Sequence, residues 1–408
     1  MAQTLKFGNG NFATKAGSTL CYDDQNGNFK PIPMDFTRAS TATRVNKQGL
    51  IEVVKSNVPR IDYTDTTNGV LLLEKAATNL INYSEDFSNS DWSKTGLTVN
   101  ANQITSPDGG LNADKVDITT ANAHYLFDTI SVSASTNYTF TFYVKKGTAT
   151  DVSYSILNAT NFTNIVNTTS YFNEISDTDW TRISVEFTTP SGCTSIRTYP
   201  LRDGSSTGTV YIWGAMLEQN SVASSYIPTQ GSASTRVAET ANGAGNSEVF
   251  NDSEGVLFCD ISGLVDEDDY RIISLNAGNS TASIFLGLRN NTGNVYMYMP
   301  TDNTSYISNV NATNKFTKIA LKYKANDVSF FINGFKVFTD NTVTLPTGLN
   351  QLDLNYGNPS NSYPFYGKTK EIAYYDTILT DLELETLTSY RTWESMVNEL
   401  NLNIIYNG

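Results

Sequence analysis

The stretch that decides the fold is Ile319-Ala-Leu-Lys-Tyr-Lys-Ala-Asn-Asp-Val-Ser-Phe-Phe-Ile-Asn-Gly-Phe-Lys-Val-Phe338. Apolar side chains alternate on both sides of a polar turn at Asn326-Asp327, namely at Ile319, Leu321, Tyr323, Val328, Phe330 and Ile332. Asn333-Gly334 predicts a second tight turn of type I′, because both residues tolerate positive φ. Alternation with period two is typical of half-buried strands, so this stretch predicts consecutive antiparallel strands.

The same pattern occurs upstream, between about residues 81 and 235. Period-two runs occupy residues 138–144, 183–187 and 211–213, and turn residues separate them at Lys146-Gly147, Ser191-Gly192 and Asp203-Gly204. Short strands at this spacing predict an antiparallel sandwich. A second strand-rich block spans about 250–378. The fold class we predict is therefore all-β, with two antiparallel β-sandwich domains of the jelly-roll kind.

The remaining segments do not follow this pattern. Residues 1–80 hold brief apolar pieces between polar turns and prolines, and we expect an irregular N-terminal module there. Ala241-Asn-Gly-Ala-Gly-Asn246 is rich in small residues and typical of a linker. The expected regions are therefore an N-terminal module (1–80), a first sandwich (81–237), a linker (238–250), a second sandwich (251–378), and a short C-terminal helix with a tail (379–408).

The C-terminal helix is predicted by Thr380-Asp-Leu-Glu383, which has the pattern of a capping box. An apolar stripe at helical spacing follows, formed by Leu384, Leu387, Trp393, Met396, Val397 and Leu400. Such a stripe packs either on its own domain or on the same helix of a neighbouring subunit. We assign Trp393, Val397 and Leu400 to an interface between copies of the chain.

Composition excludes several classes of protein. The chain has 408 residues and a net charge of −14, a field that repels a phosphate backbone, so we expect no nucleic-acid partner. No stretch approaches about 18 apolar residues, so we expect no membrane insertion. The first residues lack the apolar core of a signal peptide. Three scattered cysteines without a Cys-x-x-Cys pair indicate folding in a reducing cytosol.

Catalytic motifs are scarce. The chain has one histidine, His124, which removes multi-histidine zinc sites and leaves His-dependent nucleophilic catalysis only to that residue. His124 lies in an expected strand, and we interpret it as structural. No phosphate-binding glycine motif opens a helix after a strand. We therefore predict that the protein is not an enzyme. The alternative is glycoside hydrolysis, which needs only two of the 41 acidic residues.

Loop aromatics are the candidates for sugar binding, because exposed rings stack on sugar faces. They are Trp92, in the loop 90–93, and Tyr363, Phe365 and Tyr366, in the loop 360–367. The alternative is that these rings are buried against the ends of the sandwiches. Trp180 and Trp213 lie in strand patterns and are expected in the core.

The densest carboxylate cluster is Asp266-Glu-Asp-Asp269. Asp266, Asp268 and Asp269 are candidate Ca²⁺ ligands, because this ion prefers oxygen donors. The spaced loop of a calcium hand is missing, and a solvated turn is the alternative. No other cofactor is expected.

The chain resembles a known family in an ordered series of motifs. Phe36-Thr-Arg-Ala-Ser-Thr-Ala-Thr-Arg-Val45 and Thr78-Asn-Leu-Ile-Asn-Tyr-Ser-Glu-Asp-Phe87 look like the opening of tailed-bacteriophage head fibres, tail fibres and tail spikes. Residues 88–237 resemble the carbohydrate-binding jelly roll of those proteins, through Trp213-Gly-Ala-Met-Leu-Glu218. Residues 250–390 resemble a concanavalin-like or laminin-G-like sandwich, through Phe331-Ile-Asn-Gly334 and Ile378-Leu-Thr-Asp-Leu382.

This resemblance implies a virion appendage that is assembled in the host cytoplasm and released by lysis. Its partners would be further copies of itself, as a homotrimer, other virion proteins, and a host-surface glycan bound during adsorption. Residues 1–80 would attach it to the virion. The alternatives are a glycan depolymerase, a purely architectural decoration and an exported adhesin. The elongated β-helix that carries the enzymatic cleft of long tail spikes has no room in this chain.

Overall fold

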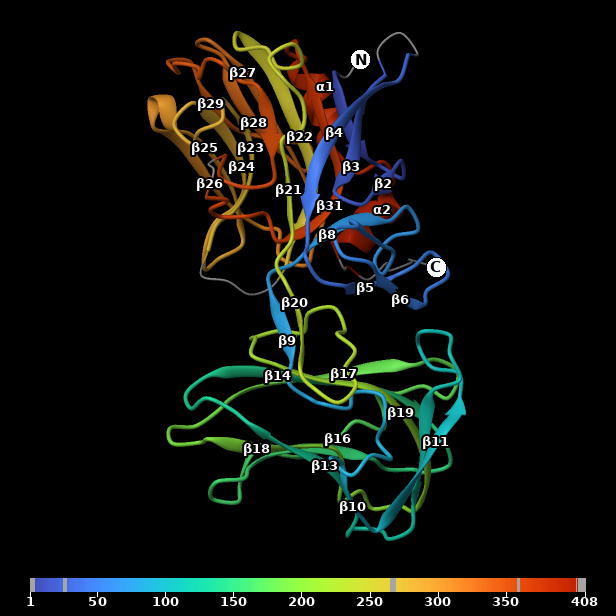
Figure 1. Ribbon diagram of the computed structural model, residues 1–408. Coiled ribbons are helices and arrows are strands. Elements are labelled where there is room, and N and C mark those ends of the chain that lie inside the picture. The colour runs from blue at the N-terminus through green and yellow to red at the C-terminus, as the bar shows by residue number, and fades with distance from the viewer. Residues whose placement is uncertain (1–3, 25–27, 265–268, 358–359, 401, 403–408) are drawn as a thin grey trace, which may run out of the picture. The chain divides into compact units, whose positions relative to one another are not determined.

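The computed structural model describes residues 4–24, 28–264, 269–357, 360–400 and 402, and it is built almost entirely from antiparallel strands (Figure 1). Its contacts divide the chain into two units. Unit 1 comprises residues 1–41, 54–75 and 238–408, and unit 2 comprises residues 42–53 and 76–237. The chain therefore passes between the units four times. The predicted all-β fold class is confirmed, but the units are not the five consecutive regions expected from the sequence.

Unit 2 is a sandwich of two five-stranded sheets. One sheet has the order β10 (Ser93–Thr95), β13 (Tyr125–Ser131), β18 (Ser195–Arg202), β15 (Ser153–Asn158) and β16 (Thr163–Ser170). The other has the order β11 (Leu97–Ile104), β12 (Ala113–Ile118), β19 (Gly208–Glu218), β14 (Asn137–Lys146) and β17 (Thr181–Thr188). Two short pairs complete the unit, β5 (Ala42–Val45) with β6 (Ile51–Val54) and β9 (Ala77–Asn79) with β20 (Ser234–Arg236).

Unit 1 also has two sheets, which share one large core. The larger has the order β21 (Thr240–Asn242), β4 (Lys30–Thr37), β3 (Ser18–Asp23), β1 (Leu5–Gly8), β31 (Gly367–Tyr375), β22 (Glu254–Gly263), β27 (Thr317–Lys324), β28 (Val328–Ile332) and β29 (Phe335–Asp340). Off this path, β2 (Thr14–Lys15) pairs with β3, and β8 (Val70–Leu73) pairs with β31 and β7 (Arg60–Asp62). The smaller has the order β26 (Thr304–Asn311), β25 (Asn294–Met299), β24 (Ser283–Leu288), β23 (Arg271–Asn276) and β30 (Gln351–Asp353). A 3₁₀ turn, η2 (Pro300–Asp302), separates β25 from β26.

Residues 1–80 do not form a module of their own, which corrects the prediction. Strand β4 alternates Ile32, Met34 and Phe36 toward the core with exposed residues between them. Its prolines, Pro31 and Pro33, lie where β4 has only β3 as a neighbour, because β21 pairs with residues 35–37 alone. Proline is tolerated on such an edge, so it does not interrupt the sheet.

The expected linker is also part of unit 1. Its strand β21 pairs with β4, and both Ala241 and Ala244 are fully buried in the core. Ala244 additionally exchanges backbone hydrogen bonds with Leu352. Small side chains suit this position because they allow the two backbones to approach closely. In the sequence alone, the same small residues look like those of a flexible linker.

The hairpin at residues 319–338 agrees with the prediction. Ile319 pairs with Ile332, and Leu321 pairs with Phe330. Asn333 and Gly334 have φ values of 48° and 88°, as a type I′ turn requires. Gly334 is needed here for space as well, because a Cβ would lie 2.6 Å from Oγ of Ser389.

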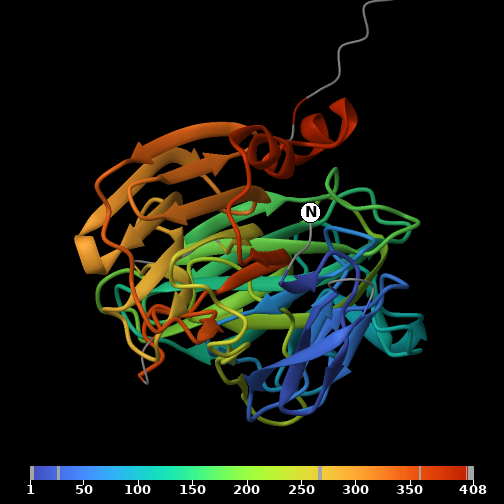
Figure 2. The same ribbon diagram turned by 90° about the horizontal axis from the view of Figure 1, so that it is seen from above.

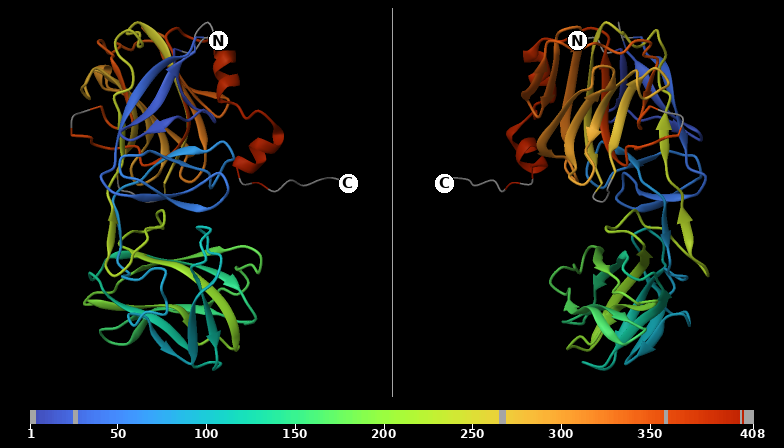
Figure 3. Two further views of the ribbon diagram at one scale, coloured as in Figure 1. Left: turned by 45° about the vertical axis from the view of Figure 1, so that its right-hand side comes forward. Right: turned by 90° about the vertical axis from the view of Figure 1, so that its left-hand side faces the viewer.

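The C-terminal helical region consists of two helices instead of one. They are α1 (Asp381–Thr388) and α2 (Trp393–Glu399), and each begins with a capping box. Ser389 is extended, and its hydroxyl donates back to the carbonyl of Glu385. Figure 2 shows α1, in red, beside the orange strands of unit 1, and both views of Figure 3 place the two helices on the outside of that unit. Within the described residues, neither helix is long and apolar enough to cross a membrane.

Candidate functional site

The smaller sheet of unit 1 carries a surface made of aromatic side chains, which we call the tyrosine surface. Its members are Tyr270, Phe285, Tyr296, Tyr298, Tyr356 and Tyr363, and each ring contacts two others. The ring centres are 6.0 Å apart for Tyr298 and Phe285, 4.4 Å for Phe285 and Tyr356, and 5.3 Å for Tyr356 and Tyr363. They are 5.7 Å apart for Tyr363 and Tyr270, 5.3 Å for Tyr270 and Tyr296, and 6.2 Å for Tyr296 and Tyr298. The six rings therefore form a closed circuit.

The strand period explains why these rings lie on the outer face. In β25, Val295, Met297 and Met299 are fully buried in the core, whereas Tyr296 and Tyr298 point the other way and are half-buried. Strand β24 follows the same alternation. Ile284 and Leu286 face the core, and Phe285 points the other way, where its fully buried ring supports that of Tyr356. Gly287, which pairs with Tyr296, adds no side chain to the outer face beside these rings.

The loop that follows β30 is held by side-chain amides and supplies two of the six rings. Asn355 donates to Oδ1 of Asn242 at 3.0 Å and to Oδ1 of Asn361 at 2.5 Å. Tyr363 has a φ of 51°, a left-handed conformation that is unusual for a bulky side chain. Such outliers cost about 1–3 kcal/mol and cluster at functional sites. The network thus holds the Tyr363 ring in place against its backbone preference.

The chemistry of this surface suits a saccharide. A tyrosine ring offers an apolar face, and its hydroxyl donates and accepts hydrogen bonds. Burial raises the pKa of the Tyr296 and Tyr356 phenols further above the neutral range. Asp353 is buried and accepts from the side-chain amide of Asn276 at 2.9 Å and the backbone amide of Gly243 at 2.6 Å, so its carboxylate supports the fold.

Of the predicted sugar-binding residues, Tyr363 alone belongs to this surface, and it is 37% exposed. Phe365 is fully buried in the core of unit 1, and Tyr366 is half-buried against it. Trp92 is 1% exposed, packs on Phe87 and donates from Nε1 to the carbonyl of Tyr83 at 2.9 Å. The predictions for Phe365 and Trp92 are therefore wrong, because both loops fold back and close the end of a sandwich.

The sequence analysis missed the strand tyrosines of this surface. The signal was present in Asn294-Val-Tyr-Met-Tyr-Met299, where two tyrosines occupy one face of a strand and apolar residues occupy the other. Tyr270, Tyr356 and Phe285 carry no such local signal, because only the sheet brings them together.

The other predicted sites have different outcomes. Asp266 and Asp268 lie outside the described residues, and Asp269 is exposed. Across the described part of the chain, no group of three His, Cys, Asp or Glu side chains is placed to hold a metal ion. The calcium site stays a prediction.

The apolar stripe of the C-terminal helix is divided by the break between α1 and α2. Leu384 packs on the larger sheet of unit 1, against Phe258 and Phe331 among others. Val397 is 2% exposed and so is covered within its own chain, which argues against its place in an intersubunit contact. Trp393 is 67% exposed and Leu400 is half-buried. An interface between copies at Trp393 and Leu400 stays a prediction.

His124 has a structural role, as predicted. It is fully buried, its Nδ1 donates to the carbonyl of Thr120 at 2.9 Å, and its Nε2 accepts from the amide of Gly204 at 3.3 Å. Both ring nitrogens are thus occupied, so the imidazole is not available as a catalytic base.

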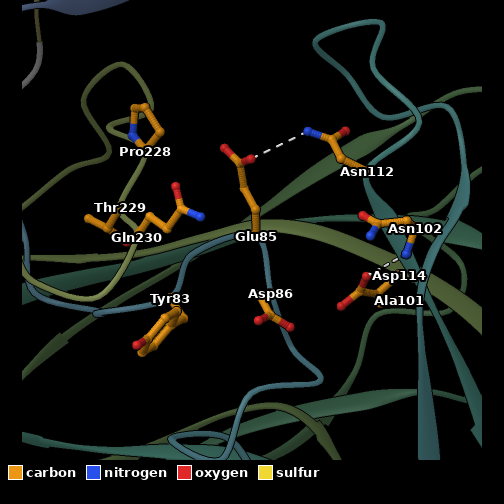
Figure 4. A pocket seen from close by; sticks show the side chains of 10 residues that line it. All are labelled: Tyr83, Glu85, Asp86, Ala101, Asn102, Asn112, Asp114, Pro228, Thr229 and Gln230. Atoms are coloured by element: carbon orange, nitrogen blue, oxygen red, sulfur yellow. Dashed lines mark hydrogen bonds between the residues drawn. The ribbon is translucent and has the colours of Figure 1, made fainter.

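Unit 2 contains a polar pocket of about 530 Å³, shown in Figure 4. Tyr83, Asn102 and Gln230 line it together with three carboxylates, Glu85, Asp86 and Asp114. Glu85 accepts from the hydroxyl of Tyr226 at 2.9 Å. It also accepts from the amide of Asn112 at 3.4 Å, as Figure 4 shows.

Asp114 is the most perturbed acid of this pocket. Burial raises its pKa to about 6, although the backbone amides of Phe87 and Asn102 donate to its two oxygens. Burial also raises the pKa of Glu85. A pair of such carboxylates is the minimum that glycoside hydrolysis requires, but both oxygens of Asp114 are already engaged by the fold.

The β-sandwich of unit 1 has a lectin-type fold. Residues 261–385 match the family model of the concanavalin A-like lectin/glucanases superfamily, and this region includes all six rings of the tyrosine surface. No curated protein matches the chain.

Solved structures of carbohydrate-binding modules and of a phage tailspike are similar to parts of the chain. The CBM40 of Ruminococcus gnavus IT-sialidase, bound to α2,3-sialyllactose, is 20% identical with a TM-score of 0.30, over 36% of this chain and 94% of that one. A family 16 carbohydrate-binding module is 21% identical with a TM-score of 0.25, over 34% and 97%. Tailspike protein 4 of bacteriophage CBA120 is 18% identical with a TM-score of 0.28, over 36% and 21%.

Proposed function

We propose that this protein is a non-enzymatic glycan-binding component of a phage virion, a head or tail fibre that presents its sandwiches to host-surface glycans during adsorption. The observation that carries the glycan-binding part is the closed circuit of six aromatic rings on the outer face of β23, β24 and β25. The virion part is supported by the resemblance of residues 36–45 and 78–87 to the opening segments of phage appendage proteins.

The tyrosine surface suits a neutral sugar for energetic reasons. A half-buried ring that is held by its neighbours loses little conformational freedom when a ligand arrives, so less of the binding energy is spent on ordering. Each sugar ring that stacks there removes apolar surface from water, at about 25 cal/mol per Å². The phenol hydroxyls then supply hydrogen bonds at the edges of the sugar.

The test is binding to an array of neutral bacterial-surface oligosaccharides, followed by calorimetry with the best binder. We expect Tyr298→Ala and Tyr363→Ala each to weaken binding at least tenfold. Phe335→Ala is the matched control, because Phe335 is 72% exposed on the other sheet of unit 1 and lies outside the tyrosine surface. If no glycan bound, or if both tyrosine variants bound as the parent does, the architectural alternative would hold.

The non-enzymatic part has its own test. Purified protein is incubated with host polysaccharide, and polymer length is followed by size exclusion. We expect no shortening. Shortening that disappears in Glu85→Gln or Asp114→Asn would establish the depolymerase alternative and locate it in the pocket of Figure 4.

A further inference from the structure

A second surface, in unit 2, carries an arginine that lies against aromatic rings. Arg197 lies in β18, and its guanidinium is placed over two phenylalanine rings, 4.6 Å from the centre of Phe127 and 5.3 Å from that of Phe162. The residue is half-buried. Within the described part of the chain, its guanidinium makes no hydrogen bond or ion pair, and its Nε is buried without an acceptor.

The register places Arg197 on the outer face of the sheet. Ile196 is in the core of unit 2, whereas Arg197 points away from it and pairs with Thr129 on one side and Leu157 on the other. Tyr199 follows on the same face, with its ring centre 4.9 Å from that of Phe127. The result is a patch of aromatic faces around one cation.

Phe162 is held over this patch in an unusual conformation. Its φ is 60°, in the left-handed region that a phenylalanine rarely adopts, while its ring remains 66% exposed. The backbone amide donates to the carbonyl of Asn158 at 2.8 Å and so fixes the turn. An exposed apolar ring in a strained turn contributes little to the stability of the fold. Such strained conformations cluster at binding sites.

The neighbouring arginine on this face is already engaged. Arg202 donates to Oγ of Ser155 and Oδ1 of Asn164, each at 3.0 Å, and lies 3.5 Å from the carboxylate of Asp203. It also stacks over Tyr199 at 4.8 Å. Arg202 therefore stiffens the patch, and Arg197 is the cation left to meet an anion from outside.

We infer that the outer face of the β10-β13-β18-β15-β16 sheet binds an acidic saccharide, with Arg197 pairing the carboxylate of a uronate unit and the rings of Phe162 and Phe127 contacting the sugar, while the buried Tyr199 ring supports that of Phe127. A guanidinium matches a planar carboxylate with two parallel N–H donors, and rings stacked on its face hold it in one orientation. Arg197 and the rings around it lie in unit 2, so this site does not depend on the tyrosine surface of unit 1.

The test uses the full chain and hexamers of galacturonate, of mixed mannuronate and guluronate, and of hyaluronan, titrated by calorimetry. We expect at least one hexamer to bind in the micromolar to low millimolar range. Arg197→Gln should weaken it at least twentyfold, and Arg197→Lys should recover only part of the loss, because lysine keeps the charge without the planar fork. Lys47→Gln removes the same charge from an exposed turn of unit 2 and should bind as the parent does.

Chemical variants of the ligand separate charge from shape. The methyl ester of the binding hexamer keeps its rings and loses its charge, and we expect it to bind the parent as weakly as the free acid binds Arg197→Gln. Equal binding of acid and ester, unchanged binding by Arg197→Gln, or no binding by any hexamer up to 10 mM would overturn the assignment. Preference for a sulfated oligosaccharide would overturn the choice of a carboxylate. The Tyr298→Ala and Tyr363→Ala variants should retain uronate binding, so failure of one site is distinguishable from failure of the other.

Discussion

Glu239 accepts a hydrogen bond from Nη1 of Arg38 at 2.7 Å, although 201 residues separate them, and both side chains are fully buried. Arg60 donates to the same carboxylate through Nε at 2.9 Å and pairs with Glu74 at 2.8 Å. Two arginines and two glutamates thus form a buried cluster of ion pairs inside unit 1. Each lies within a few residues of a point where the chain passes to unit 2, so the cluster fastens the three segments of unit 1 together.

Loss of the shared carboxylate should destabilise unit 1 strongly. In Glu239→Gln the buried guanidinium groups of Arg38 and Arg60 lose the carboxylate that both contact, and removing one partner of a buried ion pair costs about 3–5 kcal/mol. Urea unfolding followed by far-UV circular dichroism measures it. Glu248→Gln changes the same group on the surface and should stay within about 0.5 kcal/mol of the parent. Equal effects of the two variants would show that the cluster contributes nothing particular.

Tyr363 should be separable in its effects on binding and folding. Asparagine accepts the left-handed conformation more readily than tyrosine, so Tyr363→Asn relieves strain while it removes the ring. We expect the free energy of unfolding to change by less than about 1.5 kcal/mol, within the usual range of single substitutions, and glycan binding to fall at least tenfold. A large loss of stability with retained binding would contradict both the strain and the placement of Tyr363 in the site.

Asp128 should make stability depend on pH in a defined direction. Burial raises its pKa from 3.8 to about 6, so the native state holds a proton more tightly than the unfolded state does. The stability that the native state gains from binding this proton is complete below about pH 3.8 and is lost as the pH rises through 6. In Asp128→Asn the side chain stays neutral and its oxygen can still accept from the amide of Thr129. The variant should gain stability relative to the parent between pH 4 and pH 7 in urea unfolding, and a constant difference would contradict the assignment.

Trp393 offers a test of self-association. Because it is 67% exposed on α2, Trp393→Glu should leave the melting temperature within about 2 °C of the parent. If the protein is the expected trimer with this residue at the interface, light scattering behind size exclusion should show a smaller mass for the variant. An unchanged oligomer would place the interface elsewhere. Val397→Glu, in contrast, should lower the melting temperature, since that side chain is 2% exposed.

Local pattern was sufficient for the strands and for the tight turn at Asn333-Gly334, because alternation and turn chemistry act over a few residues. It was insufficient for the aromatic site. The loop aromatics Tyr363 and Phe365 are two residues apart and equivalent by local criteria, yet one is exposed and the other is fully buried. Which of them meets solvent depends on how the loop folds over the sheet, and that is decided by Asn242 and Asn355, over a hundred residues apart.

By itself the sequence determined the all-β class, the period-two strands and the structural role of a single histidine, since these follow from residue types and their spacing. Only the tertiary structure decided that β1, β3, β4, β7, β8 and β21 join one sheet with β31, that six aromatic side chains close a circuit, and that the Arg197 guanidinium has no hydrogen-bond or ion-pair partner among the described residues. The physical reason is that sheets are built from long-range pairing. Strands that are distant in the chain become neighbours through hydrogen bonds and buried area, and neither quantity is contained in a local stretch of sequence.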